Sequence, residues 1–406
     1  MRNVAVAGAG MTRFAKYQDR GLKELTNEAV TAALASAGLD KSGLQVAVVG
    51  NAAAGVITGQ ECVRAQVVLR EMGIDKIPMI NTENACASSS TAFQVAWLYV
   101  ASGLYDVALA VGVEKMYVED KAKTMAAFSG AVDVEQLREI TERLKPPSEQ
   151  KAGAESGAGK SRSLFMDIYG AAARAHMERH GTTKEHYARI AVKNHNNGSL
   201  NPHAQYRERY TLEEILASPM ISEPLTRLMC SPIGDGAAAA ILVSEEKVKQ
   251  FTTSPVWVRG SAIVSGADDR AEVGGETARA AQRAFEMAGM TLEDVHVMEV
   301  HDATAPAELL IYEELGLCEE GEGGKLIDEG VTEIGGRLPV NTSGGLLAKG
   351  HPIGATGIAQ IHEIWLQLRG EAGDRQVANA TVGLTENGGG AVRGEAAATT
   401  VHILAR

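Results

Sequence analysis

A single cysteine, Cys86, stands in a run of small residues that suits nucleophilic chemistry. It is followed by Ala87 and three serines, at what we expect to be the start of a helix. The free N–H groups and the dipole of a helix start stabilise negative charge, so the position favours a thiolate nucleophile. A buried structural cysteine, the usual role of an isolated cysteine, is the alternative that the local sequence leaves open.

His351 is the first candidate for the base that would activate such a thiol. It lies within Lys349–Gly357, which reads KGHPIGATG. The flanking glycines let the backbone approach a partner closely, and Pro352 restrains the chain where a helix begins. A histidine held in this way is a suitable base for Cys86. The alternative is a histidine that only caps a turn.

Two further segments have residue types that could complete a site. His301 directly follows an apolar strand that ends at Val300, and α/β folds gather their chemistry at the carboxyl ends of strands. Three glycines, residues 388–390, follow Glu386-Asn387 near the end of the sequence. A backbone without side chains can direct N–H groups at an oxyanion or let a ligand pass closely. A solvated histidine and an ordinary turn are the alternatives.

The elements that must position these residues recur as an internal repeat. Ala33–Leu39 matches Ala284–Met290, and Leu44–Val49 matches Val295–Val300 at the same offset. In each copy a helix ends in Ala-Gly, where glycine takes the left-handed cap conformation, and an apolar strand follows. Two similar α/β halves predict mixed sheets with helices between them and on their outer faces.

Each half continues with an apolar helix and a buried strand. The helix that includes Thr91–Leu98 is apolar nearly all round, so we expect it to be central. We expect the strands at Val107–Val111 and Val377–Val382. The first half is interrupted by an insertion with helices over 166–180 and 184–194 and a Pro/Gly/Ser-rich loop over 146–161. The expected domains are a first half at 1–115 plus 231–250, an inserted loop domain at 116–230 and a second half at 251–406.

Composition excludes several classes of function. The chain has 406 residues and a net charge of −12, without a basic run that could follow nucleic-acid phosphates. Its four cysteines form no C-x-x-C pair, which indicates a reducing, cytoplasmic setting and no structural zinc site. No apolar stretch approaches about 18 residues, so we expect no membrane span.

Two apparent motifs are rejected. Residues 154–161 resemble a phosphate-binding loop, but they lack its first glycine and no apolar strand precedes them. His176 and His180 are spaced as two ligands on a helix, but the H-E-x-x-H pattern is not present. We expect an irregular loop and a solvated helix face.

Taken together, the motifs resemble those of the thiolase family, over essentially the whole chain and in the family's order. The resemblance rests on Cys86 in its small-residue context, the CSPIGDGAAA string at 230–239, His301-Asp-Ala, the GHPIGATG string at 350–357 and the late glycines. Lys349 and the His-Asp-Ala motif resemble the sterol-carrier-protein-type and archaeal-type branch.

The resemblance implies an α/β thiolase fold, with two pseudo-symmetric βαβαβαββ halves in a five-layered αβαβα body and an inserted loop domain. It implies acyl-CoA and CoA as substrates, with no metal or redox cofactor. It also implies a homodimer or homotetramer, in a branch that often works with a small companion protein.

The family's roles can be assigned to residues of this sequence. The resemblance implies that Cys86 takes the acyl group, that His351 activates it and that His301 helps to hold the enolate oxygen of the second acyl-CoA. The N–H groups of Cys86 and of Gly388 or Gly389 would hold the acyl-enzyme oxyanion. CoA would lie against the loop domain, near Ser231.

One departure matters for the reaction. Most thiolases have a second reactive cysteine, whereas the corresponding positions here are Glu386 and Ala303. Glu386 could be the base, His351 could serve both steps, or the acceptor could need no strong base. We therefore expect an acyl-CoA C-acyltransferase, such as an acetyl-CoA acetyltransferase or 3-ketoacyl-CoA thiolase. The alternatives are C-acylation of a non-CoA acceptor, retro-aldol cleavage of a CoA ester, or a non-catalytic CoA-binding subunit.

Overall fold

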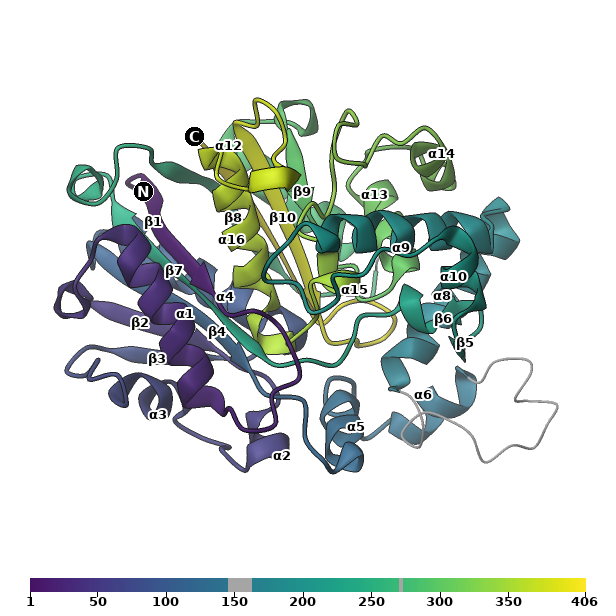
Figure 1. Ribbon diagram of the computed structural model, residues 1–406, viewed down its shortest axis with the longest axis horizontal. Coiled ribbons are helices and arrows are strands. Elements are labelled where there is room, and N and C mark those ends of the chain that lie inside the picture. The colour runs from purple at the N-terminus through teal and green to yellow at the C-terminus, as the bar shows by residue number, and fades with distance from the viewer. Residues whose placement is uncertain (145–162, 270–272) are drawn as a thin grey trace.

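One mixed sheet organises the molecule (Figure 1). The computed structural model describes residues 1–144, 163–269 and 273–406, and in these residues nine strands are ordered β3-β2-β4-β7-β1-β8-β11-β10-β9. The strands are β1 (Val4–Met11), β2 (Val46–Gly50), β3 (Met79–Thr82), β4 (Val107–Glu114), β7 (Gly236–Ser244), β8 (Val256–Val264), β9 (Val297–Glu299), β10 (Val382–Gly389) and β11 (Ala398–Ala405). The two halves of the sheet meet where β1 pairs with β8, through Ala5 opposite Trp257 and Val6 opposite Val256.

The two halves have the same strand pattern, as the repeat predicts. In the first half β2 and β4 are parallel, and β4 continues through antiparallel β7 to β1. In the second half β9 and β10 are parallel, and β10 continues through antiparallel β11 to β8. An isolated parallel bridge from Met298 to Val340 stands where the first half has β3.

Helices and the half-sheets alternate in five layers, which confirms the expected fold. The helices α4 (Ser88–Ala101) and α16 (Thr356–Arg369) share one hydrophobic core with strands of both halves. A second core joins the outer face of the first half to α1 (Leu22–Ala37) and α3 (Arg64–Arg70). A third joins the second half to α12 (Glu276–Ala288) and α13 (Ala305–Glu314). The apolar helix after Cys86 is therefore central, as predicted.

Local sequence signals explain several element ends. α1 and α12 stop at Gly38 and Gly289, whose φ angles of 61° and 64° are the left-handed caps expected from the Ala-Gly repeat. The predicted strand at Val377–Val382 is wrong, because the chain turns through Asn379 at φ 58° and β10 begins only at Val382. The first two late glycines consequently lie in β10 and not in a turn.

The insertion between β4 and β7 is mostly helical. Its elements are α5 (Lys121–Ser129), α6 (Leu137–Arg143), α8 (Leu164–His180), α9 (Lys184–Ser199), α10 (Leu212–Ala217), β5 (Met220–Ser222) and β6 (Leu225–Thr226). The two predicted helices are confirmed as α8 and α9, which pack with α10 and α13 around a separate small core. The expected loop at 146–161 and the phosphate-loop lookalike at 154–161 lie outside the described residues.

The remaining short helices complete the chain. They are α2 (Ala54–Thr58), α14 (Gly323–Asp328), α15 (Gly345–Ala348) and the 3₁₀ turns at Lys41–Gly43, Ala85–Ala87, Arg227–Met229, Val248–Gln250, Leu292–Asp294, Ile353–Ala355 and Gly373–Arg375. Across the described ranges, none of the helices has the length and apolar character needed to cross a bilayer.

Candidate active site

Cys86 lies on a tight turn between β3 and α4. Ala85 has a φ of 46°, a conformation that non-glycine residues rarely adopt, and the short 3₁₀ helix Ala85–Ala87 leads directly into α4. The hydroxyl of Ser88 accepts a bond from the N–H of Asn84 at 3.0 Å and donates to the Ala85 carbonyl at 2.6 Å. The turn is thus held from inside by the serines that follow the nucleophile.

The glycines of β10 allow this turn to be closely packed. A Cβ on Gly389 would lie 2.1 Å from the Asn84 carbonyl oxygen and 2.6 Å from the Ala87 nitrogen. The next amide along, that of Gly390, donates to the Cys86 sulfur. The segment thus brings backbone N–H groups to the nucleophile, although the N–H in contact is that of Gly390 and not that of Gly388 or Gly389.

His351 is oriented by the start of α16. Its Nε2 lies 3.2 Å from the Cys86 sulfur, and its Nδ1 lies 2.7 Å from the Thr356 hydroxyl. That hydroxyl donates its only proton to the Pro352 carbonyl at 3.1 Å, so it must accept from Nδ1–H. His351 therefore has its proton on Nδ1 and turns the lone pair of Nε2 toward the thiol, which is the arrangement of a general base. The role of Thr356 was not expected from the sequence.

His301 faces the same point from the end of β9. Its ring centroid is 5.2 Å from that of His351, and ligand atoms of Cys86, His301 and His351 all lie within 4.8 Å of one another. Burial lowers the pKa of His301 to about 4 and that of His351 well below its usual value, so both rings are neutral near pH 7. The His301 Nε2 is buried and has no protein partner in the described structure, which leaves it for a substrate oxygen.

Cys86 is a thiol in the ligand-free protein, contrary to the expectation of a thiolate. Burial raises its pKa to about 12, and the charge of Glu114 adds to this effect. The amides of Gly390 and of Cys86 itself act in the opposite direction but do not offset the burial. His351 Nε2 is placed to accept the Cys86 proton if the sulfur acts as a nucleophile.

Ala303 and Glu386, the positions where most thiolases have a second reactive cysteine, lie near the cluster formed by Cys86, His301 and His351. Ala303 lines the catalytic cavity. Glu386 is buried in β10, and one of its carboxylate oxygens accepts the His301 N–H at 2.9 Å. Burial raises the Glu386 pKa to about 8, so an appreciable fraction is ionised near neutral pH.

The catalytic cavity opens between the body and the insertion. It has a volume of about 220 Å³ and is lined by Cys86, His351 and Ala303 on one side. The insertion supplies a largely apolar wall. This wall comprises Met125, Ala127, Phe128, Ala131, Phe165, Met166, Tyr169, Tyr206 and Ile221. Ser231 also lines the cavity, together with the exposed Arg227.

Buried charges brace the segments that present the histidines. Lys349 and Glu299 form an ion pair at 3.2 Å with no solvent exposure, which links the His351 segment to the end of β9. The Asp302 carboxylate accepts the Leu346 N–H at 2.6 Å and the Asn194 side-chain N–H at 2.7 Å, so it ties the His301 segment to α15 and α9. Local sequence offered no signal for Asn194, because its partners are distant along the chain.

Glu114 plays a similar bracing role on the nucleophile side. Its carboxylate accepts bonds from the Asn51 side chain at 2.8 Å, the Ala52 N–H at 2.9 Å and the Gly354 N–H at 3.1 Å. The last contact joins β4 to the turn that follows His351. Burial raises the Glu114 pKa to about 7. Sequence reasoning missed this residue, since it resembles an ordinary charged strand end.

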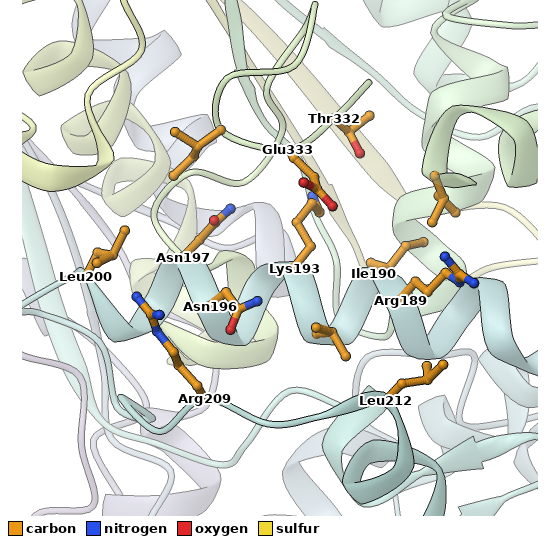
Figure 2. Close-up of a pocket in the computed structure, with 13 residues that line it drawn as sticks. Arg189, Ile190, Lys193, Asn196, Asn197, Leu200, Arg209, Leu212, Thr332 and Glu333 are labelled. Carbon is orange, nitrogen blue, oxygen red and sulfur yellow. The ribbon is translucent and has the colours of Figure 1, made fainter. Parts of the chain in front are cut away.

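A second, larger cavity lies away from the catalytic cluster. Figure 2 shows it along α9, where Lys193 and Asn197 lie beside Thr332 and Glu333 of the segment after α14. Its volume is about 500 Å³. The Lys193 amino group binds the Glu308 carboxylate and the Val340 carbonyl, so it supports the fold and not a reaction.

Comparisons with known proteins agree with this arrangement. Residues 4–246 match the family described as "Thiolase, N-terminal domain", and residues 264–406 match "Thiolase C-terminal domain-like". The chain belongs to the thiolase family. It is 40% identical to an acetyl-CoA acetyltransferase of Methanothermobacter thermautotrophicus, with all of both chains covered. It is 38% identical to sterol carrier protein 2 of Bos taurus, over 95% of this chain and 70% of the relative.

Solved structures of thiolase-fold proteins superpose over almost the whole chain. The Ltp2-ChsH2(DUF35) aldolase is 27% identical, with a TM-score of 0.78 over 99% of this chain and 97% of that one. Human mitochondrial 3-ketoacyl-CoA thiolase in complex with CoA is 19% identical, with a TM-score of 0.72 over 100% and 98%. The latter likeness supports the fold alone.

Proposed function

We propose that the protein is an acyl-CoA C-acyltransferase, of the acetyl-CoA acetyltransferase or 3-ketoacyl-CoA thiolase type, that forms an acyl-enzyme on Cys86. The carrying observation is the 3.2 Å contact between the Cys86 sulfur and a His351 Nε2 whose lone pair is fixed by Thr356. A relative at 40% identity over the full chain is an acetyl-CoA acetyltransferase, which supports the same reaction class.

In the first half-reaction the Cys86 sulfur attacks the thioester carbonyl while its proton passes to His351. The oxyanion that forms is held by backbone N–H groups, of which those of Cys86 and Gly390 already contact the sulfur. Collapse of the intermediate breaks the carbon–sulfur bond to CoA, and His351 returns the proton to the departing thiol. The products are acyl-Cys86 and free CoA.

In the second half-reaction the acceptor must become a carbon nucleophile. The neutral ring of His301, with its proton on the unpartnered Nε2, can donate to the oxygen of an enolate beside Cys86. We assign the removal of the α-proton to Glu386, since Ala303 has no titratable group. Burial raises the Glu386 pKa to about 8, and a base with a pKa near the working pH is effective.

A retro-aldol cleavage of a CoA ester is the second candidate. The Ltp2-ChsH2(DUF35) aldolase, at 27% identity and a TM-score of 0.78, favours it. In that reaction a base removes the proton of a β-hydroxyl group, the bond between the α and β carbons breaks, and the His301 Nε2–H holds the oxygen of the resulting enolate. Such an enzyme would not need an acyl group on Cys86.

The substrate and assembly proposals follow from the cavity and the relatives. We place CoA between the insertion and the body, with Arg227 and Ser231 at the cavity and the thioester at Cys86. We also propose a homodimer or homotetramer with a small companion protein, and the similarity to the Ltp2-ChsH2(DUF35) aldolase supports the companion. All four cysteines are free, which supports the reducing cytoplasmic location.

Intact-protein mass spectrometry after mixing with acetyl-CoA or acetoacetyl-CoA tests the proposal. The wild type and Cys318→Ala should each gain one acetyl group from either donor, with release of CoA from acetyl-CoA and of acetyl-CoA from acetoacetyl-CoA, and Cys86→Ala should gain none. Cleavage of acetoacetyl-CoA by free CoA then measures the full reaction. If neither these donors nor longer acyl-CoAs label Cys86 while a β-hydroxyacyl-CoA is cleaved, the aldolase replaces the transferase.

A further inference from the structure

The proposed catalytic side chains also form a cluster of metal-ligand atoms. The sulfur of Cys86 and ring nitrogens of His301 and His351 all lie within 4.8 Å of one another. Thiolate sulfur and imidazole nitrogen are the ligands that Zn²⁺ takes in tetrahedral sites, where three protein ligands leave one position open. Usual zinc bond lengths of ~2.3 Å to sulfur and ~2.0 Å to nitrogen place the two ligand atoms about 3.5 Å apart. The observed 3.2 Å from sulfur to Nε2 is within a small movement of that value.

The surroundings prepare two of these ligands for a metal. A histidine that binds a metal usually donates its other ring N–H to a fixed acceptor, and His351 does so to Thr356 at 2.7 Å. The His301 Nε2 is a buried polar atom without a protein partner in the described residues. A metal ion would satisfy such an atom, which otherwise costs free energy when it is left unpaired.

We propose that this cluster binds Zn²⁺ and that the bound ion reversibly blocks acyl transfer. The Cys86 thiol loses its proton to solvent, the thiolate binds the ion, and the two neutral imidazoles supply the second and third ligands. The fourth position faces the catalytic cavity and takes water. No electrons are transferred, and a chelator reverses the reaction. The block on acylation rests on the proposed function, whereas the binding of the ion does not.

A pair of histidines on α8 provides the control. His176 and His180 lie on α8 with ring centroids 4.7 Å apart, beside the carboxylates of Glu313 and Glu320. Both rings are already bonded to these side chains, and no thiol is among their partners. His176 is buried, so this helix face is not solvated as the sequence suggested. His180→Gln removes this competing pair and leaves the proposed site intact.

Titration of the metal-free protein with Co²⁺ and Zn²⁺ tests the binding. Co²⁺ bound to a thiolate gives a sulfur-to-metal absorption band in the near ultraviolet, and Zn²⁺ should displace it at one ion per chain. We expect Cys86→Ala to abolish the band and His301→Ala to weaken binding at least 100-fold. Thr356→Val should weaken it about 10-fold. His180→Gln should match the wild type, and Mg²⁺ should not compete. Circular dichroism verifies that each variant is folded.

Alkylation of Cys86 by iodoacetamide, located by peptide mass spectrometry, gives a second readout that needs no turnover. Zn²⁺ should slow the labelling at least 10-fold and a chelator should restore it. The proposal is overturned if no thiolate band appears, or if folded Cys86→Ala binds Zn²⁺ as tightly as the wild type. A protein that binds Zn²⁺ through Cys86 but never forms an acyl-enzyme would keep the site and refute the transferase.

Discussion

The two helix entries at the centre of the molecule share a shape and differ in chemistry. Cys86 lies within the 3₁₀ turn Ala85–Ala87 before α4, whereas His351 lies two residues before the 3₁₀ turn Ile353–Ala355 that leads into α16. Each follows a residue at positive φ, Ala85 at 46° and Gly350 at 107°. The first entry is closed by serine hydroxyls and glycine backbone, and the second by a threonine hydroxyl and a buried ion pair. The duplicated fold thus supplies a 3₁₀ turn and a helix start twice. In the mechanism that we propose, the first copy carries the nucleophile and the segment just before the second carries the base.

The largest expected effect comes from breaking the base side. His351→Asn removes the lone pair that takes the Cys86 proton, so acyl-enzyme formation should slow about 10²–10⁴-fold. Rapid-quench mass spectrometry measures the rate. Cys230→Ser, a change of a thiol that also lines the cavity, should keep the wild-type rate to within a few-fold. If the rate were unchanged in His351→Asn, His351 would not be the base, and the proposed difference between the two helix starts would be refuted.

Glu386→Gln should separate the two half-reactions. Acylation of Cys86 should persist, while the condensation step and the exchange of α-protons of acetyl-CoA into deuterated water should fall about 10²–10⁴-fold. In the wild type the exchange rate should rise with pH through about 8, because the base acts when ionised. Glu386→Gln should lose that rise. If the wild type and Glu386→Gln exchanged these protons at the same rate, the base that removes the α-proton would be His351 and not Glu386.

The ion pair beneath the second entry should dominate stability. Lys349→Met leaves the Glu299 carboxylate buried without its cation and should destabilise the fold by about 3–5 kcal/mol. Lys349→Met with Glu299→Gln should recover much of that loss. The exposed pair Lys23–Glu71 provides the contrast, and Lys23→Met should leave the urea midpoint unchanged. A small loss in Lys349→Met would show that the entry does not depend on the pair.

A matched glycine pair tests the packing at the first entry. In Gly389→Ala the new Cβ overlaps the Asn84 carbonyl, so we expect about 1–3 kcal/mol of destabilisation and slower acylation. In Gly388→Ala the nearest atom is 3.5 Å away, which is ordinary contact, and both properties should be preserved. Thermal unfolding and acyl-enzyme rates check the pair. Similar behaviour of the two variants would refute the close approach.

The stability of the fold is also expected to depend on pH. Burial raises the pKa of Glu386 from 4.5 to about 8 and that of Glu114 from 4.5 to about 7. The folded chain then binds more protons than the unfolded chain between these values, so this contribution is complete below about 4.5 and is lost as the pH rises to about 8. Denaturant unfolding between pH 5 and pH 8 measures it, and Glu386→Gln should reduce the slope.

Structural features that depend on one short segment of sequence could be predicted. The repeat, the glycine-capped helices and the central position of α4 all follow from local pattern and are confirmed. The convergence of Cys86 and His351 follows from the family motifs. Val377–Val382 failed as a strand because apolar composition does not reveal a left-handed turn at Asn379.

Contacts through space could not be predicted in this way. Thr356 orients His351, Gly390 reaches the sulfur and Glu114 joins β4 to the turn after His351. Each of these residue types is compatible with many roles, and only the fold decides which partner it meets. The neutral state of Cys86 also depends on burial by distant segments, which outweighs the helix-start effect that the sequence suggests.

The narrow seam between β1 and β8 has a consequence for how activity can be acquired or lost. Cys86 belongs to one half-sheet, whereas His301, His351 and Glu386 belong to the other, and only two residue pairs join the halves within the sheet itself. Neither half on its own contains a nucleophile with its base. Under the proposed mechanism, acylation of Cys86 would report the docking of the halves, and a small rotation at their shared helical layer would prevent it without unfolding either one.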